Sequence, residues 1–201
     1  MNAGNNMTQG SSVDLKDLDL RIENVVATAS LEQKIDLPSI MKVFRNVEYR
    51  PRRFPGLVFR MKNPKTATLI FTTGNMVCTG AKSAKMAISA VRKVVRELRK
   101  EGFIIKRRPK IKIVNIVGTA NVGGKVDLEA AAAIMDNIMY EPEQFPGLIY
   151  RIPEPKVVML IFSSGKTVIT GGKTREQVEE AVEILRGFLR DNQLLYGIEN
   201  G

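Results

Sequence analysis

Histidine and tryptophan are absent from the 201 residues, and Cys78 is the only cysteine. A single thiol cannot form an internal disulfide, so the composition is typical of a protein from a reducing compartment. Acid–base and metal-assisted catalysis rely mainly on histidine, cysteine and clustered carboxylates, and no acidic pair or metal-ligand cluster recurs in the sequence. We therefore predict that the protein is not an enzyme, that it binds no metal and no cofactor, and that Cys78 is a core residue.

Long apolar runs are also missing, since none approaches the roughly 18 residues that a membrane-spanning helix needs. Residues 1–12 are polar and lack the apolar centre of a signal peptide. The glycines fall at turns and form no phosphate-cradling motif. The sequence thus predicts no membrane partner, no small-molecule substrate and a cytoplasmic location.

Basic residues are in excess, and they are unevenly distributed. The formal net charge is +10, from 31 Lys and Arg against 21 Asp and Glu. Residues 1–112 hold 23 basic and 9 acidic residues, whereas residues 113–201 hold 8 and 12. The excess indicates a polyanionic partner, and nucleic acid is one candidate. The uneven distribution indicates that separate partners bind where the two parts of the chain differ.

One segment of the sequence occurs twice, at a constant offset of 91 residues. Phe54-Pro55-Gly56-Leu57 returns as Phe145-Pro146-Gly147-Leu148, and Leu69-Ile70-Phe71 returns as Leu160-Ile161-Phe162. From Ile22 to Phe103 the alignment needs no gap, and roughly 30 of about 82 aligned pairs are identical. Such a period is too long for a solenoid unit, so it predicts a duplicated half-domain with a pseudo-twofold axis.

Each repeat predicts five strands and two helices in the same order. The first helix begins at Asp36, an N-cap residue followed by Pro38 in the first turn, and the second has an apolar stripe opposite a basic face. The predicted strands of the first repeat are 22–30, 47–49, 54–61, 66–72 and 75–80. Its first predicted helix starts at 36, and its second spans 83–102. The second repeat restates this order from 113 to 195.

The predicted organisation is therefore a single intertwined domain. We expect a flexible N-terminal tail over 1–18, a first repeat over 19–106 and a second repeat over 107–201. Roughly ten antiparallel strands and four helices follow from the duplication, an α+β fold with all four helices on one face of a curved sheet.

The other face of that sheet is expected to be an exposed apolar surface. Strands such as 67–71 and 157–162 are apolar at nearly every position, which is typical of strands covered on both faces, yet the helices suffice for one face only. A sandwich or barrel that covers its own second face is the alternative. By alternation, the uncovered face carries two equivalent sets: Asn24, Val26, Leu69, Phe71, Val77 and Thr79, then Asn115, Val117, Leu160, Phe162, Val168 and Thr170.

Basic residues are expected around the margin of this face. Strand ends and turns carry Arg53, Arg60, Lys65 and Lys82 in the first repeat and Arg151, Lys156, Lys166 and Lys173 in the second. An apolar floor with a basic rim suits the minor groove of DNA, where sugars and base edges lie between two walls of phosphates.

The paired FPGL and LIFxxG segments, each followed by V-x-T-G-x-K, together with N-x-V on the opening strands, resemble the TATA-box-binding protein family. The resemblance covers about Leu20 to Leu195 and suggests an archaeal member. It implies a saddle-shaped fold and a general transcription initiation factor that binds double-stranded TATA DNA in the minor groove. A nucleoid-associated location in the archaeal cytoplasm, or a nuclear one in a eukaryote, would follow.

The same resemblance implies roles for individual residues. Phe71 and Phe54, the latter next to Pro55, would wedge between base pairs at one end of the TATA element. Phe162 and Phe145, the latter next to Pro146, would do so at the other end. Asn24 and Asn115 would donate to adenine N3 and thymine O2, which lie in the minor groove. The groove floor would be contacted by Val26, Val77, Val117, Val168, Leu69, Leu160, Thr79 and Thr170, and phosphates by the eight basic residues of the margin.

Two features distinguish the repeats within this pattern. Lys166 follows the hairpin glycine in the second repeat, where the first has Asn75, so one phosphate contact is expected to be missing. Glu141 and Glu143 stand where the first repeat has arginines. The resemblance implies that their loop binds transcription factor B, which then brings the RNA polymerase machinery. The sequence leaves open whether the free protein forms a homodimer through its apolar underside.

Other functions remain open at this point. The uncovered sheet could bind RNA in the manner of an RRM domain, although such domains stack bases on aromatic rings from mid-strand, and all four phenylalanines here are predicted near strand ends. A non-catalytic protein-interaction scaffold is the second alternative. The half-saddle domain found with glycosylases is a third, but the chain has no room for a catalytic domain beside it.

Overall fold

The computed structural model describes residues 19–197, in which the elements follow the same order in two halves. The predicted tail at 1–18 lies outside the described residues. The first half contains β1 (Arg21–Ser30), α1 (Leu37–Val43), β2 (Val47–Tyr49), β3 (Leu57–Lys62), β4 (Lys65–Ile70), β5 (Asn75–Ala81) and α2 (Ala84–Lys100). The second contains β6 (Lys110–Asn121), β7 (Lys125–Val126), α3 (Leu128–Ile134), β8 (Ile138–Met139), β9 (Leu148–Ile152), β10 (Val157–Ile161), β11 (Lys166–Gly172), α4 (Arg175–Asp191) and β12 (Leu195–Tyr196).

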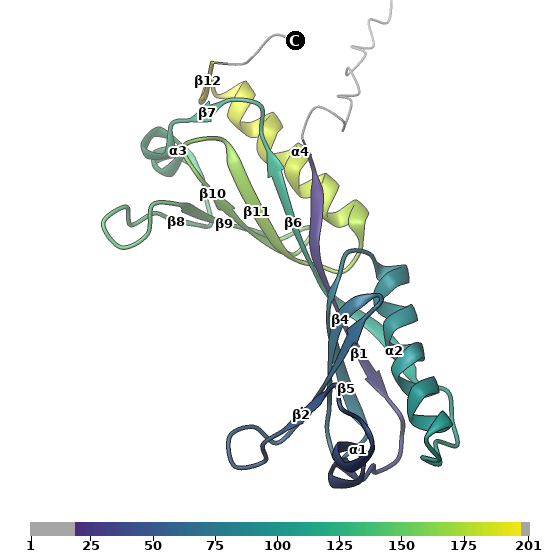
Figure 1. Ribbon diagram of the computed structural model, residues 1–201. Helices are drawn as coiled ribbons and strands as arrows, with labels where there is room; N and C mark the ends of the chain where they lie inside the picture. Colours follow the sequence, from purple (N-terminus) through teal and green to yellow (C-terminus); the bar gives the residue numbers. More distant parts are fainter. Residues whose placement is uncertain (1–18, 198–201) are drawn as a thin grey trace, which may run out of the picture.

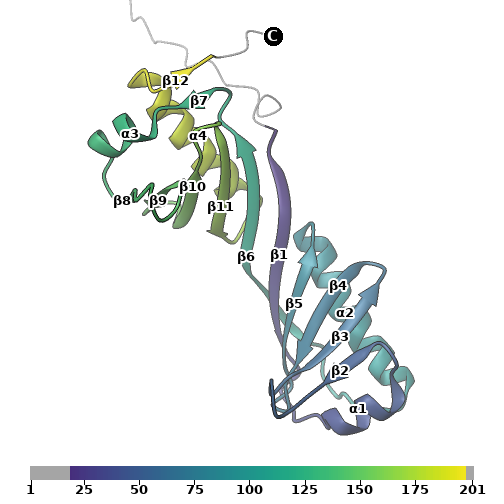
Figure 2. The ribbon, with the colours of Figure 1, turned by 60° about the vertical axis from the view of Figure 1, so that its left-hand side comes forward.

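Ten of the strands form a single antiparallel sheet in the order β2-β3-β4-β5-β1-β6-β11-β10-β9-β8. The two halves meet at its centre, where β1 and β6 lie side by side and pass from one half toward the other (Figure 2). The sheet curves, α2 and α4 lie along its convex side, and the short helices α1 and α3 lie at the two outer ends (Figure 1). The predicted fold class, a curved ten-stranded sheet with four helices and two repeats, is confirmed.

Equivalent capping residues fix the start of every helix. The Asp36 side chain accepts a hydrogen bond from the Ser39 backbone N–H, and Asp127 accepts from that of Ala130 at 2.9 Å. Ser83 and Thr174 cap α2 and α4 in the same way. Since a side-chain cap satisfies an N–H group that the helix itself leaves free, the repeated sequence begins its helices at repeated places.

The core lies between the sheet and the long helices. On β4 and β5, Ile70, Met76 and Cys78 are fully or almost fully buried, as are the apolar residues of the inner stripe of α2. Burial raises the pKa of the Cys78 thiol, in keeping with a packing residue. The predicted alternation on these strands and the core position of Cys78 are confirmed.

The structure differs from the predicted strand limits near the phenylalanines. Strand β3 begins at Leu57 and not at Phe54, because residues 50–54 form a turn in which the Arg50 carbonyl accepts from the N–H groups of Arg53 at 2.8 Å and of Phe54 at 3.0 Å. Strand β4 ends at Ile70, one residue before Phe71. A separate two-stranded sheet of β7 and β12 was not predicted from the sequence. In residues 19–197, no helix is long and apolar enough to cross a membrane.

Candidate nucleic-acid interface

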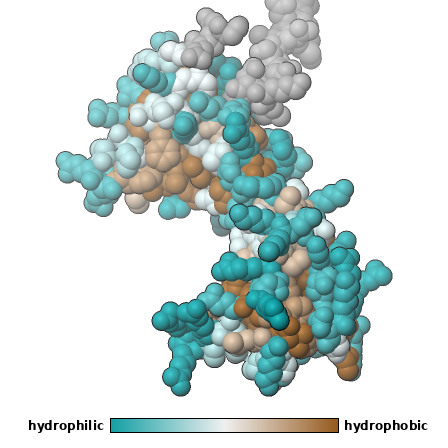
Figure 3. Space-filling view, in the orientation of Figure 1, coloured by the Kyte–Doolittle hydropathy of each residue, from teal (hydrophilic) through white to brown (hydrophobic). Residues whose placement is uncertain are grey.

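The sheet face opposite α2 and α4 is covered by no other element of the described chain. Its apolar side chains are only half-buried, in contrast to their neighbours on the same strands. Figure 3 shows apolar surface over β9 to β11 in one half and near β1 and β5 in the other, with hydrophilic side chains around it. Residues 19–197 contain no group of three or more acidic or cysteine side chains that could hold a metal ion.

Cross-strand rows build this face. Leu69 pairs with Val77 on one side and with Val58 on the other, and Val77 pairs in turn with Thr28. In the second half, Leu160 pairs with Val168 and Ile149, and Val168 pairs with Thr119. Residues that face each other across an antiparallel pair share one side of the sheet, so each row forms a continuous floor.

Val58 and Ile149 were missed by the reasoning from sequence. A signal for Val58 was present, because the two-residue turn at Asn63-Pro64 places Lys62 opposite Lys65 and thereby Val58 opposite Leu69.

Asn24 is held by its neighbours in one orientation. Its Oδ1 accepts from the Gly80 backbone N–H at 2.7 Å, and its Nδ2 donates to Thr79 Oγ1 at 3.0 Å. A backbone N–H can only donate, so it decides which end of the amide is oxygen. An amide nitrogen carries two hydrogens and Thr79 takes one, which leaves a second N–H for a ligand acceptor.

Asn115 repeats this arrangement in the second half. Its Oδ1 accepts from the Gly171 N–H at 2.7 Å, and its Nδ2 lies 3.2 Å from Thr170 Oγ1. Gly80 and Gly171 have φ angles of +94° and +102°, a region that suits glycine. We call each set of asparagine, threonine and glycine an amide clamp. The structure thus brings each predicted asparagine into contact with the predicted threonine of its own half.

The four phenylalanines form two equivalent pairs. Phe54 and Phe71 pack edge to face with ring centroids 5.8 Å apart, and Phe145 and Phe162 do the same at 5.8 Å. Phe54 remains 38% exposed, unusual for a large apolar ring. Gly56 makes the first pair fit, because a Cβ at this position would lie 2.7 Å from Phe54 Cε1, and Gly147 has the same contact with Phe145. Pro55 and Pro146 beside them are exposed.

The eight basic residues of the predicted rim are all exposed. Arg60 and Arg151 stand opposite Ala67 and Val158, which places them in rows of the uncovered face. Lys82 is engaged within the protein, since its Nζ lies 3.0 Å from Glu23 Oε2. Within residues 19–197, the four basic rim residues of the second half lie near no carboxylate in an ion pair.

Glu23 was also missed by the reasoning from sequence. Besides Lys82, it accepts a hydrogen bond from Thr119 Oγ1 at 3.2 Å, across the boundary between the two halves. The Lys82 ammonium, with help from Thr119, holds the pKa of Glu23 below its usual range, so it is ionised at neutral pH. It borders a hollow of about 600 Å³ beside Phe162, lined also by Asp19 and Arg21.

The loops that follow β2 and β8 project on the uncovered side of the sheet, at the two ends of the molecule (Figure 1). Glu141 and Glu143 are exposed in the second of these loops. In the first, Arg50 pairs with Glu48 at 3.0 Å, and Arg52 is exposed. The loops therefore have opposite charge in equivalent places.

Comparison with known proteins finds similarity to the same family in both halves of the chain. A family model described as "Transcription factor TFIID (or TATA-binding protein, TBP)" matches residues 19–101 and 110–192. The "TATA-box-binding protein" of Pyrodictium occultum is 58% identical over 161 residues, which are 80% of this chain and 81% of that protein. Its namesake from Sulfolobus acidocaldarius is 52% identical over 164 residues, 82% and 83% of the two chains.

A solved structure shows the same fold. The structure titled "Methanococcus jannaschii TBP" is 44% identical to this chain and superposes with a TM-score of 0.79. The match covers 86% of this chain and 98% of the other.

Proposed function

The chain belongs to the TATA-box-binding protein family and resembles its archaeal members, and from this premise we propose that it is a general transcription initiation factor that binds TATA-box DNA in the minor groove. This is a family of DNA-binding transcription factors and not of enzymes. The two repeats, 19–106 and 107–201, act as one intertwined domain. The place of such a protein in the cell is with the chromosomal DNA.

The observation that carries this proposal is the pair of amide clamps on an uncovered face. Each clamp leaves an N–H donor free, and the minor groove offers acceptors at every base pair, adenine N3 and thymine O2 among them. Guanine adds a protruding N2 amine, which would lie against the floor made by Val26, Val77 and their equivalents Val117 and Val168. The clamps and the floor therefore favour A·T over G·C pairs.

The phenylalanine pairs act at the ends of the contacted element. Rings of these pairs would enter between two base pairs and open the groove, which costs stacking energy. Pyrimidine–purine steps such as TA unstack most easily, so TATA sequences lower that cost. Insertion at both ends bends the duplex along the curved floor, which Leu69 and Leu160 help to form, and the exposed lysines and arginines of the rim contact the phosphates.

The second-half loop supplies the contact for the next factor. Glu141 and Glu143 present negative charge at the end of the saddle, which suits a basic surface of transcription factor B, and through it the RNA polymerase machinery is recruited. When no DNA is bound, the apolar underside pairs with that of a second copy, because exposed apolar area of this kind is stabilised by burial.

The test compares binding to a short TATA duplex with binding to a duplex in which G·C pairs replace the element. Fluorophores at both DNA ends report the bend, and several salt concentrations separate groove contacts from phosphate contacts. We expect tight, TATA-selective binding with a sharp bend. A single-stranded RNA of the same sequence is the control for the alternative sheet-surface function.

Weak binding without a bend, equal for both duplexes and steeply dependent on salt, would contradict the proposal. Such a result would show that the protein binds DNA through its positive charge alone, without recognising TATA. The protein-interaction scaffold would then be the better supported function.

A further inference from the structure

The two halves carry their rim cations on different strands of the same cross-strand row. In the first half, Ser30 pairs with Asn75 on one side and with Lys110 on the other. The offset of 91 residues turns this row into Lys166, Asn121 and Asp19, and Lys166 indeed pairs with Asn121. The charge that Lys166 places on β11 of the second half is thus absent from β5, the equivalent strand of the first half, and the lysine of that row lies on the central strand β6 instead.

The next row contains a cation in both halves. Thr28 pairs with Val77 and with Lys112, so Lys112 lies on the same face as the apolar floor. In the second half, Arg21 pairs with Thr119, which pairs with Val168. Lys112 and Arg21 are therefore equivalent by sequence and by place in the sheet.

These cations differ in how far the protein itself neutralises them. Lys110 lies 2.6 Å from Glu32, and Arg21 lies 2.9 Å from Asp19. Lys112 and Lys166 are exposed and belong to no ion pair within residues 19–197. Each half thus presents one uncompensated lysine at this rim, on β6 for the first half and on β11 for the second.

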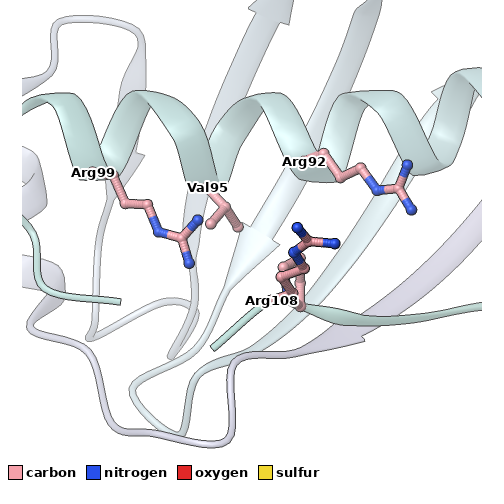
Figure 4. A pocket seen from close by; sticks show the side chains of 5 residues that line it. Arg92, Val95, Arg99 and Arg108 are labelled. Atoms are coloured by element: carbon pink, nitrogen blue, oxygen red, sulfur yellow. The ribbon is translucent and has the colours of Figure 1, made fainter. Parts of the chain in front are cut away.

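The place of Lys112 is fixed by contacts of the segment that leads into β6. Arg99 of α2 donates to the carbonyl oxygens of Ile105 at 2.9 Å and of Arg107 at 2.9 Å. Arg99 on the helix and Arg108 on the segment line one hollow of about 410 Å³. Figure 4 shows how the two side chains lie. Gln33 holds the other side, donating to the Ile104 carbonyl at 2.7 Å and accepting from the Lys106 N–H at 3.1 Å. Strand β6 therefore starts in a defined register against β1.

We propose that Lys112 binds a DNA backbone phosphate on the rim of the first half and replaces the charged contact that Asn75 cannot make. The inference rests on the proposed function and adds a residue to it. Lys112 lies two strands inward from Asn75 and two residues along the strands, which is about 12 Å at a strand spacing of roughly 4.8 Å and a rise of roughly 3.4 Å per residue. The phosphates contacted by the two halves are consequently not related by the pseudo-twofold axis. The nearly symmetric saddle therefore makes an asymmetric set of phosphate contacts on the DNA.

The first test is the salt dependence of TATA binding by the full chain and its Lys112→Gln variant. Loss of one phosphate contact lowers the slope of log K against log salt concentration by about 0.9 and weakens binding several-fold near 0.1 M salt. Lys85→Gln is the matched control, because Lys85 is exposed on α2, on the opposite face. It is expected to change neither quantity.

A rescue variant separates a phosphate contact from a structural effect. Adding Asn75→Lys to Lys112→Gln places a lysine on β5, as Lys166 is placed on β11, and is expected to recover the slope. Thermal unfolding of each variant without DNA is expected to match the parent, since the Lys112 side chain is exposed and forms no ion pair with residues 19–197.

Neutral methylphosphonate links placed one at a time in the TATA duplex locate the phosphate. At one position on the first-half side, Lys112→Gln is expected to have no further effect. An unchanged slope in Lys112→Gln, with TATA-selective bending intact, would overturn the phosphate contact alone. If the parent protein neither selects TATA DNA nor bends it, the proposed function fails, and this inference fails with it.

Discussion

Helices α2 and α4 occupy equivalent places in the two repeats, yet α2 has an excess of basic residues and α4 an excess of acidic ones. Helix α2 contains six basic residues and one acidic residue, whereas α4 contains three basic and five acidic residues. Lys85 and Arg92 correspond to Glu176 and Glu183 by the offset of 91. The projecting loops differ in the same sense, with Arg50 and Arg52 against Glu141 and Glu143.

On the uncovered sheet face, by contrast, the two halves are alike. The amide clamps agree in their closest distance, 2.7 Å in both halves, and the phenylalanine pairs agree in their centroid separation, 5.8 Å in both. Duplex DNA presents similar backbone and base edges in both directions, so a duplicated protein can meet it with two copies of one surface. Protein partners have no such symmetry, and the surfaces that meet them are free to diverge.

The largest effect is expected where the two halves are alike. Phe54→Ala and Phe145→Ala each remove one proposed wedge, and each is expected to weaken TATA binding by about tenfold to 100-fold, with a smaller bend. The measurement is fluorescence-detected binding and bending with end-labelled DNA. Similar losses in the two variants would support equivalent halves. If one variant binds and bends as the parent does, that half does not wedge. Phe103→Leu, a change outside these pairs, serves as the control.

A large effect on a different complex is expected where the halves differ. Reversing both charges, Glu141→Arg with Glu143→Arg, is expected to weaken the complex of protein, DNA and transcription factor B at least about tenfold, because like charges then face each other. DNA binding alone is expected to change little. Gel-shift titration with the factor checks this. The matched control is Arg50→Glu with Arg52→Glu, and an intact ternary complex in the Glu141 and Glu143 variant would refute the assignment of this loop.

A smaller effect is expected from the amide clamps. In Asn24→Asp, one carboxylate oxygen still accepts from the Gly80 N–H, but the other replaces the donor and faces the base acceptors. We expect TATA affinity to fall about tenfold, and Asn115→Asp to match it within about threefold. Competition binding measures both. A loss of TATA affinity in only one of the two variants would show that the two halves contact the bases differently.

The smallest effect is expected at a contact that only the second half possesses. Tyr196 donates to Asp127 Oδ2 at 2.9 Å, whereas the residue equivalent to Tyr196 in the first half is Ile105. The Ala130 N–H first, and Tyr196 second, lower the pKa of Asp127. A lowered pKa in the folded state stabilises the protein above the unfolded pKa, and that contribution is lost as the pH falls through the folded value.

Tyr196→Phe is therefore expected to lower the melting temperature slightly at neutral pH and less at acidic pH. The pKa of Asp127, followed by NMR titration, is expected to rise. An unchanged pKa of Asp127 would show that the hydrogen bond from Tyr196 does not stabilise the ionised carboxylate in solution. Tyr49→Phe provides a control without an aspartate contact.

Much of this protein is determined by the sequence itself. The repeat fixes the number and order of the main elements, because equal patterns of apolar alternation and equal caps at Asp36 and Asp127 form equal local structures. Alternation also separates Leu69 and Val77 from Ile70 and Cys78, since the period of a strand is two. These are local properties, which depend on residues close together along the chain.

Other features depend on which strands become neighbours, and only the tertiary structure decides that. The clamp joins Asn24 to Thr79 across 55 residues, and its orientation comes from a backbone N–H that a sequence pattern does not place. Lys112 reaches the uncovered face because β6 pairs with β1 in one register, and a shift of one residue would turn it to the core. Long-range register therefore sets the donors and charges that DNA meets, while the short-range pattern of the sequence sets the apolar floor beneath them.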